Sequence, residues 1–307
     1  MTVILLGPQR FRPSVRETLQ SLDATGPVAT ITAGWQEREP DDDELDALLD
    51  GRGRNLGLYG RWLDVLERDP ELHDAIRQHT EVLDELQSVY TLWLTHAIAA
   101  VSELVLRDIQ ARVAVAALDD AILALRDIDR RHVQLIGEVY DEFYDRWKPH
   151  ERPVVAEHRA AVATALEECA AVALAGGHVG ALLDCLHLFN VAPALAGKSV
   201  FGWSAGAMAM TDRVLLYNDL APDGRSYSEV LGSGLGLCPG VVALPHARRR
   251  LRLDDPVRVL VMARRLAPAT CVILEDGARV ECSPDGLPAG TPILTTDGQI
   301  GVTGAAA

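Results

Sequence analysis

The sequence predicts an α/β fold, with an open, mostly parallel sheet and helices on both of its faces, interrupted by a large all-α insertion. Short apolar runs of the kind that form strands buried on both faces occur near the start of the chain and again after about residue 170. Between them, residues 41–169 show the three- and four-residue apolar spacing of amphipathic helices and almost no strand pattern. We therefore expect an α/β core formed by residues 1–40 and 170–307, and a helical insertion over residues 41–169.

The first part of the core has a β-α-β pattern. Residues 2–6 and 28–33 are apolar and rich in β-branched side chains, and residues 14–22 between them have helical spacing. Ser14 and Glu17 stand three residues apart at the start of this helix, which is the spacing of a capping box.

Four more strands are expected in the second part of the core, at residues 170–175, 198–202, 240–244 and 270–274. Each of these apolar runs ends in a turn that carries polar residues or glycine. Because the carboxyl ends of parallel strands line the ligand crevice of an open sheet, the four turns should meet in one place. The tail after residue 277 is expected to form short antiparallel strands.

Length, composition and charge exclude several classes of protein. The 307 residues correspond to one large or two ordinary domains, at roughly 150 residues each, and 48% of them are hydrophobic, so the chain can bury a core. With 29 basic and 44 acidic side chains, the net charge is −15. This excess argues against a nucleic-acid partner and against an anionic membrane surface. The most apolar long stretches, residues 94–118 and 160–176, contain charged side chains, and we do not expect them to span a membrane.

The five cysteines, an odd number, show no metal-ligand spacing. This usage suits buried thiols in a reducing compartment. We therefore expect a cytoplasmic protein.

The sharpest local signal is the G-x-S-x-G pattern of residues 202–206, which lies between an expected strand and an expected helix. A sharp strand-to-helix turn exposes the serine hydroxyl, and the glycines let the strand and the helix approach each other. The alternative is a tight turn with a helix-capping serine. The strand–turn–helix setting favours Ser204 as a nucleophile.

A serine nucleophile needs a base and an acid that orients it. His246 follows the expected strand at 240–244 and is the best candidate base, with His187 and His178 as alternatives. Glu275 and Asp276 both follow the next strand, and either one could be the third member. The chain order serine, histidine, acid differs from that of ordinary α/β-hydrolases and indicates a different fold with convergent chemistry.

The glycine pair before His178 opens another expected helix. The amides of Gly177 and Ala205 are the natural donors of an oxyanion hole, although the pair also fits a plain β-α turn or a phosphate-binding turn. No histidine pair has the spacing of a zinc site, and no metal or organic cofactor is expected. Neighbouring positions are candidate substrate contacts: Gly176, His178, Trp203, Arg249 and Asp276.

Four motifs resemble, in order along the chain, those of the aspartyl dipeptidase (peptidase E) and cyanophycinase family of serine peptidases. They are AGGHVGALL at 175–183, GWSAGA at 202–207, GLGLCPGVVALPH at 234–246 and VILEDG at 272–277. The resemblance implies a class I glutamine amidotransferase-like fold with serine in place of cysteine at the nucleophile elbow.

The same resemblance implies roles for five residues of this chain. Ser204 would be the nucleophile, His246 the base and Glu275 the third member of the triad, while the amides of Gly177 and Ala205 would bind the oxyanion. Two features depart from the family. His178 stands where the family has Asn or Gln, and the helical segment is far larger than in compact members.

The sequence thus predicts a serine hydrolase that cleaves a peptide or amide bond in a small substrate. The alternative is a catalytically inactive family member that binds a partner or ligand through its helical insertion. A small-molecule esterase or acyltransferase shares the same elbow. The insertion is large enough to cover the site, to build a substrate wall or to form the surface of a homodimer.

Overall fold

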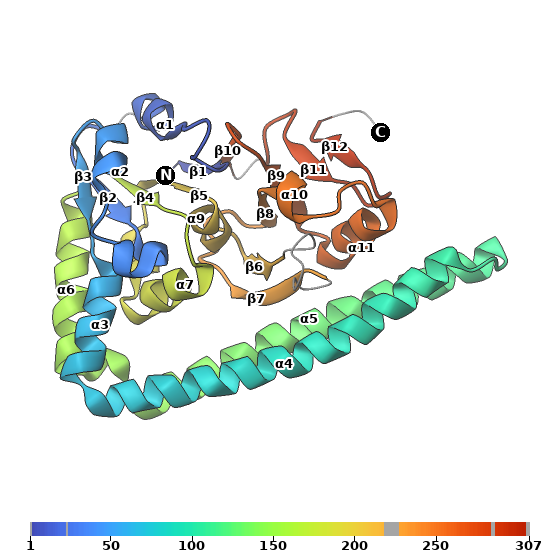
Figure 1. Cartoon of the computed structure of the whole chain (residues 1–307), viewed down its shortest axis with the longest axis horizontal. Helices are drawn as coiled ribbons and strands as arrows, with labels where there is room; N and C mark the ends of the chain where they lie inside the picture. Colours follow the sequence, from blue (N-terminus) through green and yellow to red (C-terminus); the bar gives the residue numbers. More distant parts are fainter. Residues whose placement is uncertain (1, 23, 218–226, 284–285, 305–307) are drawn as a thin grey trace.

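A six-stranded sheet forms the centre of the computed structural model, which describes residues 2–22, 24–217, 227–283 and 286–304 (Figure 1). The strand order is β10-β1-β5-β4-β2-β3, and all neighbours are parallel except β10, which pairs antiparallel with β1. The strands are β1 (Val3–Leu6), β2 (Val28–Ile31), β3 (Gly53–Asn55), β4 (Ala171–Leu174), β5 (Ser199–Trp203) and β10 (Arg279–Cys282). The predicted fold class is confirmed.

Helices cover both faces of this sheet, because its strands are apolar on both sides. In β1, Val3 and Leu5 belong to one hydrophobic cluster, whereas Ile4 and Leu6 belong to another. The second cluster lies under α1 (Val15–Ser21) and α2 (Asp43–Leu48), and the first includes side chains of α3 (Leu58–Arg68), α6 (Pro153–Glu167) and α7 (Val179–Leu188).

A second sheet of four strands has the order β12-β11-β9-β8, with β8 and β9 parallel and the other pairs antiparallel. The strands expected at 240–244 and 270–274 therefore form, but in this sheet and not in the central one. A separate hairpin joins β6 to β7. The bounds are β6 (Arg213–Leu216), β7 (Glu229–Ser233), β8 (Val241–Pro245), β9 (Thr270–Leu274), β11 (Pro292–Leu294) and β12 (Ile300–Val302), with α10 (Ala247–Arg250) and α11 (Pro256–Leu266) between β8 and β9.

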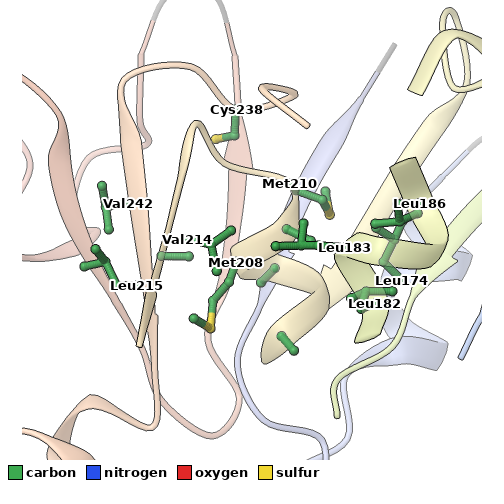
Figure 2. Close-up of a cluster of buried hydrophobic side chains, with 14 of the residues drawn as sticks. Leu174, Leu182, Leu183, Leu186, Met208, Met210, Val214, Leu215, Cys238 and Val242 are labelled. Atoms are coloured by element: carbon green, nitrogen blue, oxygen red, sulfur yellow. The ribbon is translucent and has the colours of Figure 1, made fainter. Parts of the chain in front are cut away.

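A buried apolar cluster connects the two sheets (Figure 2). Leu174 at the end of β4 and the leucines of α7 lie on one side of the short helix α9 (Ala205–Ala209), and β6 and β8 lie on the other. Met208 of α9, Val214 of β6 and Val242 of β8 fill the space between α9 and these two strands. This cluster supports the turn that carries Ser204.

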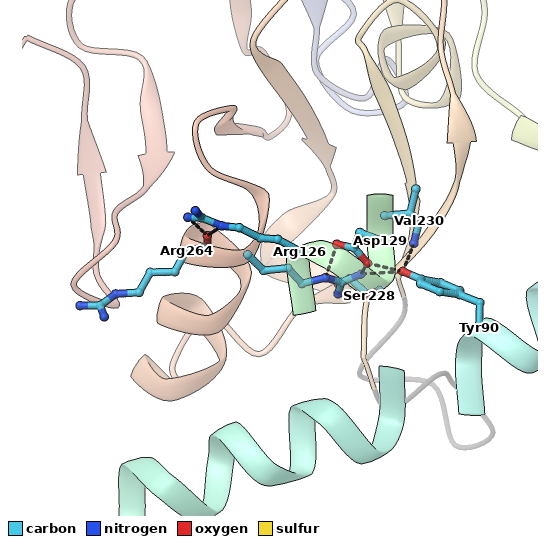
Figure 3. A network of polar contacts seen from close by, with 7 residues as sticks. Tyr90, Arg126, Asp129, Ser228, Val230 and Arg264 are labelled. Carbon is cyan, nitrogen blue, oxygen red and sulfur yellow. Dashed lines mark hydrogen bonds and ion pairs between the residues drawn. The ribbon is translucent and has the colours of Figure 1, made fainter. Parts of the chain in front are cut away.

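The long helices α4 (Pro70–Leu106) and α5 (Ala111–Trp147) form a hairpin that we call the arm. It runs beneath the body and projects past α11 (Figure 1). Buried polar contacts hold it in place: Asp129 of α5 pairs with Arg265 of α11, and the Tyr90 hydroxyl contacts both and accepts a hydrogen bond from the Val230 amide (Figure 3). By length and composition alone, α4 is the one described helix that could cross a membrane.

Three expectations need correction, beginning with the segment at 41–169, which is not wholly helical. The strand β3 lies within it and pairs in parallel with β2 at the edge of the central sheet. Its sequence, Gly-Arg-Asn, has no apolar side chain, so the hydrophobic pattern could not reveal it.

The short helices α8 (Val191–Ala194), η1 (Ala33–Arg38) and η2 (Pro149–Glu151) complete the described elements.

The predicted capping box at the start of α1 is also wrong. Ser14 occupies the N-cap position, but its side chain makes no capping hydrogen bond. Instead, the Gln9 side-chain oxygen accepts hydrogen bonds from the amides of Ser14 and Val15, at 2.6 and 3.2 Å. Gln9 thus binds the Ser14 amide, which Glu17 would bind in a capping box.

The expectation of buried thiols holds for only three of the five cysteines. Cys169, Cys185 and Cys271 are free and buried, whereas Cys238 and Cys282 form a disulfide. The two bonded residues are separated by 44 positions. They meet because the chain returns from β9 to the central sheet at β10, and a separation of 44 residues does not by itself indicate a bond.

Candidate active site

Ser204 occupies the sharp turn between β5 and α9. Its backbone angles are φ 50° and ψ −120°, a conformation that costs energy in any residue with a side chain. Gly206 allows the turn to close, because a Cβ there would collide with the carbonyl oxygen of Leu174 in the neighbouring strand. The strained serine between a strand and a helix has the geometry that the G-x-S-x-G pattern predicts.

His246 reaches this serine from the second sheet. It follows β8, and its amide donates a hydrogen bond to the Leu274 carbonyl of β9, at 3.1 Å. Its Nε2 atom lies 3.4 Å from Oγ of Ser204. This distance is long for a hydrogen bond, but the contact is of the kind that tightens when a substrate binds.

The two sheets are joined at the ends of their strands. Gly7, which follows β1 of the central sheet, lies against the backbone carbonyl of Glu275, and its amide donates to the Ala278 carbonyl at 2.9 Å. A Cβ at Gly7 would collide with Glu275, so glycine is required at this approach. The strand-end turns of both sheets therefore meet around Ser204 and His246.

Glu275 and Asp276 lie in the turn after β9. One carboxylate oxygen of Glu275 accepts a hydrogen bond from the Arg248 amide, at 2.7 Å. In the part of the chain that the structure describes, neither acid forms a hydrogen bond with the His246 ring. Both carboxylates act on that ring through their charge alone.

The surroundings of His246 favour its neutral form. Burial lowers the pKa of the imidazole, and the positive charges of Arg250 and Arg249 lower it further. The negative charges of Asp276 and Glu275 act in the opposite direction but do not reverse the shift. A neutral imidazole beside a hydroxyl can accept its proton.

The glycine turn after β4 packs directly against the serine. A Cβ on Gly176 would lie 2.9 Å from Cβ of Ser204 and 3.5 Å from its Oγ. Gly177 has φ 122°, and a side chain there would collide with the Gly34 carbonyl, which accepts a hydrogen bond from the His178 amide at 2.7 Å. On the other side of the serine, the Ala205 amide stands at the first position of α9, where no intrahelical acceptor exists.

Of the remaining candidates, two are exposed to solvent and three have contacts away from Ser204. Trp203 is 8% exposed and packs in the core under α1 and α2, whereas Arg249 and Asp276 are exposed. Nδ1 of His178 accepts a hydrogen bond from the Ala181 amide and caps α7. The ring of His187 packs against Tyr140, at 5.6 Å between centroids, so neither alternative base is directed to Ser204 by a described contact.

Two supporting residues were not predicted. The buried Tyr217 hydroxyl donates a hydrogen bond of 2.6 Å to the Pro245 carbonyl and so holds the residue before His246. Arg250 lowers the His246 pKa, and nothing in the sequence distinguishes it from the adjacent Arg248 and Arg249. Within the described ranges, no group of three or more His, Cys, Asp or Glu side chains could hold a metal ion.

Comparisons with known proteins bear on the family of the chain. Among solved structures, it is similar to the crystal structure of a peptidase from an acI-B1 Actinobacterium, with a TM-score of 0.46 and 13% identity over 96% of this chain and 91% of that chain. No curated protein sequence matches it. The sequence model of peptidase family S51 matches residues 130–287, just over half of the chain, and this range includes Ser204, His246 and Glu275. The chain therefore belongs to peptidase family S51 and is a serine peptidase.

Proposed function

We propose that the protein hydrolyses a peptide or amide bond in a small substrate, with Ser204 as the nucleophile and His246 as the general base. One observation carries this proposal: Oγ of a serine in a strained strand-to-helix turn lies 3.4 Å from Nε2 of a half-buried histidine. The lowered pKa of His246 supports it, because a neutral imidazole is ready to accept the proton.

In the proposed reaction, Ser204 Oγ attacks the substrate carbonyl carbon while its proton moves to Nε2 of His246. The amides of Gly177 and Ala205 donate hydrogen bonds to the oxyanion of the tetrahedral intermediate. His246 then gives the proton to the leaving amine, which departs as the C–N bond breaks. Water hydrolyses the resulting acyl-enzyme with the same histidine acting as base.

Glu275 is proposed as the acid that stabilises the charged form of His246. Its hydrogen bond to the Arg248 amide fixes the carboxylate at the start of α10, two residues after the histidine. Asp276 remains the alternative, since its negative charge also raises the pKa of the imidazole.

A fluorophosphonate probe, which reacts with activated serines, tests the nucleophile. We expect the full-length protein to be labelled and Ser204→Ala to be unlabelled, with Ser88→Ala as the matched control because Ser88 is an exposed serine on α4. Labelling of Ser204→Ala at the rate of the unchanged protein would refute the proposal. Failure of the folded protein to react at all would favour the inactive, ligand-binding alternative.

The division into domains follows from the order of the elements along the chain. We propose that residues 1–40 and 170–307 form one core interrupted by residues 41–169, within which β3 nevertheless joins the central sheet. The net charge of −15 supports a partner that is neither nucleic acid nor an anionic membrane. A cytoplasmic location stays a prediction that the Cys238–Cys282 bond does not support, since disulfides persist mainly in oxidising compartments.

A further inference from the structure

We propose that the outer half of the arm, residues 89–118, is the surface through which two copies of this chain associate. The two hairpins would pack side by side and antiparallel, forming a four-helix bundle around a two-fold axis near Ala99. This inference is independent of the chemistry at Ser204.

The outer half of the arm exposes more apolar surface than a two-helix hairpin can bury. The contacts of Asp119 and Arg126 with Arg264 mark where α11 reaches α5, and beyond α11 the hairpin stands free of the body (Figure 1). Large apolar side chains are nevertheless exposed on this free part and its turn, namely Val105, Leu106, Ile109, Val113 and Val115, and on α4 nearer the body, namely Leu92 and Trp93. Only 22% of the most apolar stretch of α4 is buried. A second apolar face of this size indicates a covering partner.

The apolar positions are arranged so that the surface can pair with a copy of itself. Leu92, Ala99 and Leu106 recur every seven residues on α4, and all three are exposed, Leu92 at 57% and Leu106 at 80%. Residues seven apart lie on the same face of a helix. If two arms run antiparallel with Ala99 at the two-fold axis, Leu92 of each copy meets Leu106 of the other, and the small alanine lets the helices approach.

Charge also favours a second copy over other partners. Residues 89–118 contain two acidic side chains, Glu103 and Asp108, and two basic ones, Arg107 and Arg112, so their net charge is zero in a chain that carries −15. Residues 89–118 are therefore a part of the arm where two such acidic molecules can meet without strong repulsion.

A membrane is a poorer occupant of this surface. Although α4 is apolar enough to enter a bilayer, its hairpin partner α5 carries Asp119 and Asp120 alongside it. Carboxylates are expensive inside a bilayer, and the two helices would have to enter together.

The length of the arm fits the area that a stable dimer needs. Each arm helix has 37 residues and is about 55 Å long, at 1.5 Å per residue. Two adjacent helices, each about 10 Å wide and overlapping over ~30 Å, present on the order of 600 Å² per partner. Standard protein interfaces bury about 600–1,000 Å² per partner, so this area lies at the low end of that range.

Analytical ultracentrifugation of the full chain tests the dimer. We expect twice the chain mass of 33.2 kDa for the unchanged protein, and an at least ~100-fold higher dissociation constant for Leu106→Glu with Val113→Glu, because these carboxylates would be buried without partners. The matched control is Val82→Glu, which places the same charge on an exposed valine of the inner half of α4 and should leave the dimer intact. Circular dichroism verifies that the helices persist.

Cysteine cross-linking tests the register. Ala99→Cys should form a disulfide between two chains under mild oxidation by copper phenanthroline, and Val82→Cys should not. The free native cysteines are buried, so we do not expect them to form bonds between chains. A monomeric unchanged protein would overturn the proposal, in favour of a membrane if it sediments with phosphatidylcholine vesicles and of a different protein partner if it does not. A dimer that tolerates the two tip glutamates, or that cross-links equally at both positions, would also overturn it.

Discussion

Arg250 lies close enough to His246 for its positive charge to affect the imidazole. The pH dependence of the reaction should therefore change when this charge is removed. The arginine charge lowers the pKa of the imidazole, so Arg250→Gln should raise that pKa. Because the reaction needs the neutral base, the acidic limb of the kcat/KM profile should move to higher pH, with activity lost on the acid side and retained above it.

The measurement is a pH–rate profile at low salt, because salt screens the charge of an exposed arginine. The control is Arg38→Gln, which removes an exposed arginine that is not among the charges that shift the His246 pKa. An acidic limb that stays in place in Arg250→Gln would contradict the assignment of His246 as the base.

Gly206 shows how one missing side chain permits the elbow. A Cβ at this position would meet the carbonyl oxygen of Leu174, so Gly206→Ala should lower the free energy of unfolding by about 1–3 kcal/mol and displace Ser204. Gly137 is the matched control: it lies inside α5 with nothing within 4 Å of an added Cβ. Gly137→Ala should therefore stabilise the protein by about 0.5–1 kcal/mol. Urea unfolding measures both, and an equal effect of the two changes would be inconsistent with the close approach.

At the scale of whole elements, the arm is held to the body by a buried ion pair. Asp129 is 1% exposed and Arg265 3%, and they contact each other through two hydrogen bonds of 2.7 Å (Figure 3). Asp129→Ala should cost about 3–5 kcal/mol, because it leaves a buried guanidinium without its partner. Replacing both residues with leucine should restore much of the loss, since an apolar pair has no charge to desolvate.

The comparison is with Asp127→Ala, which removes an exposed carboxylate paired with Arg130 on the surface of the same helix. Its cost should stay below about 1 kcal/mol. If denaturant unfolding gives the same loss for Asp127→Ala and Asp129→Ala, the buried pair does not anchor the arm.

The elements also show which parts of the fold can be predicted from sequence. The strands β1, β2, β4, β5, β8 and β9 were predicted because each is a buried apolar run followed by a turn. By contrast, β3 was missed because an edge strand of three residues needs no apolar face. The distribution of strands between two sheets depends on pairings between distant segments, which local patterns do not contain.

The same division applies to the site. Ser204 and His246 were predicted together because each follows an expected strand, and the structure brings them within 3.4 Å. The contact between Glu275 and the Arg248 amide was not predictable, because it depends on how the turn after β9 packs against α10. Backbone partners of this kind leave no residue-type signal in a single sequence.

At the scale of the whole molecule, Ser204 and His246 belong to different sheets, so their distance depends on how the sheets are held together. The Cys238–Cys282 bond contributes directly, because Cys282 ends β10 of the central sheet and Cys238 precedes β8 of the second sheet. The bond closes a loop of about 44 residues and restricts the unfolded chain. Replacing both cysteines with serine should therefore lower the free energy of unfolding by about 2–4 kcal/mol.

Urea unfolding with and without dithiothreitol separates the effect of the bond from that of the substitutions. The reductant should destabilise the unchanged protein by a similar amount and leave the double serine variant unaffected, because Cys169, Cys185 and Cys271 are already free thiols. Reductant that destabilises both proteins equally would show that the bond does not join the sheets in solution. Fluorophosphonate labelling of the same samples then reports whether the two sheets still hold Ser204 within reach of His246, and we expect slower labelling wherever the bond is absent.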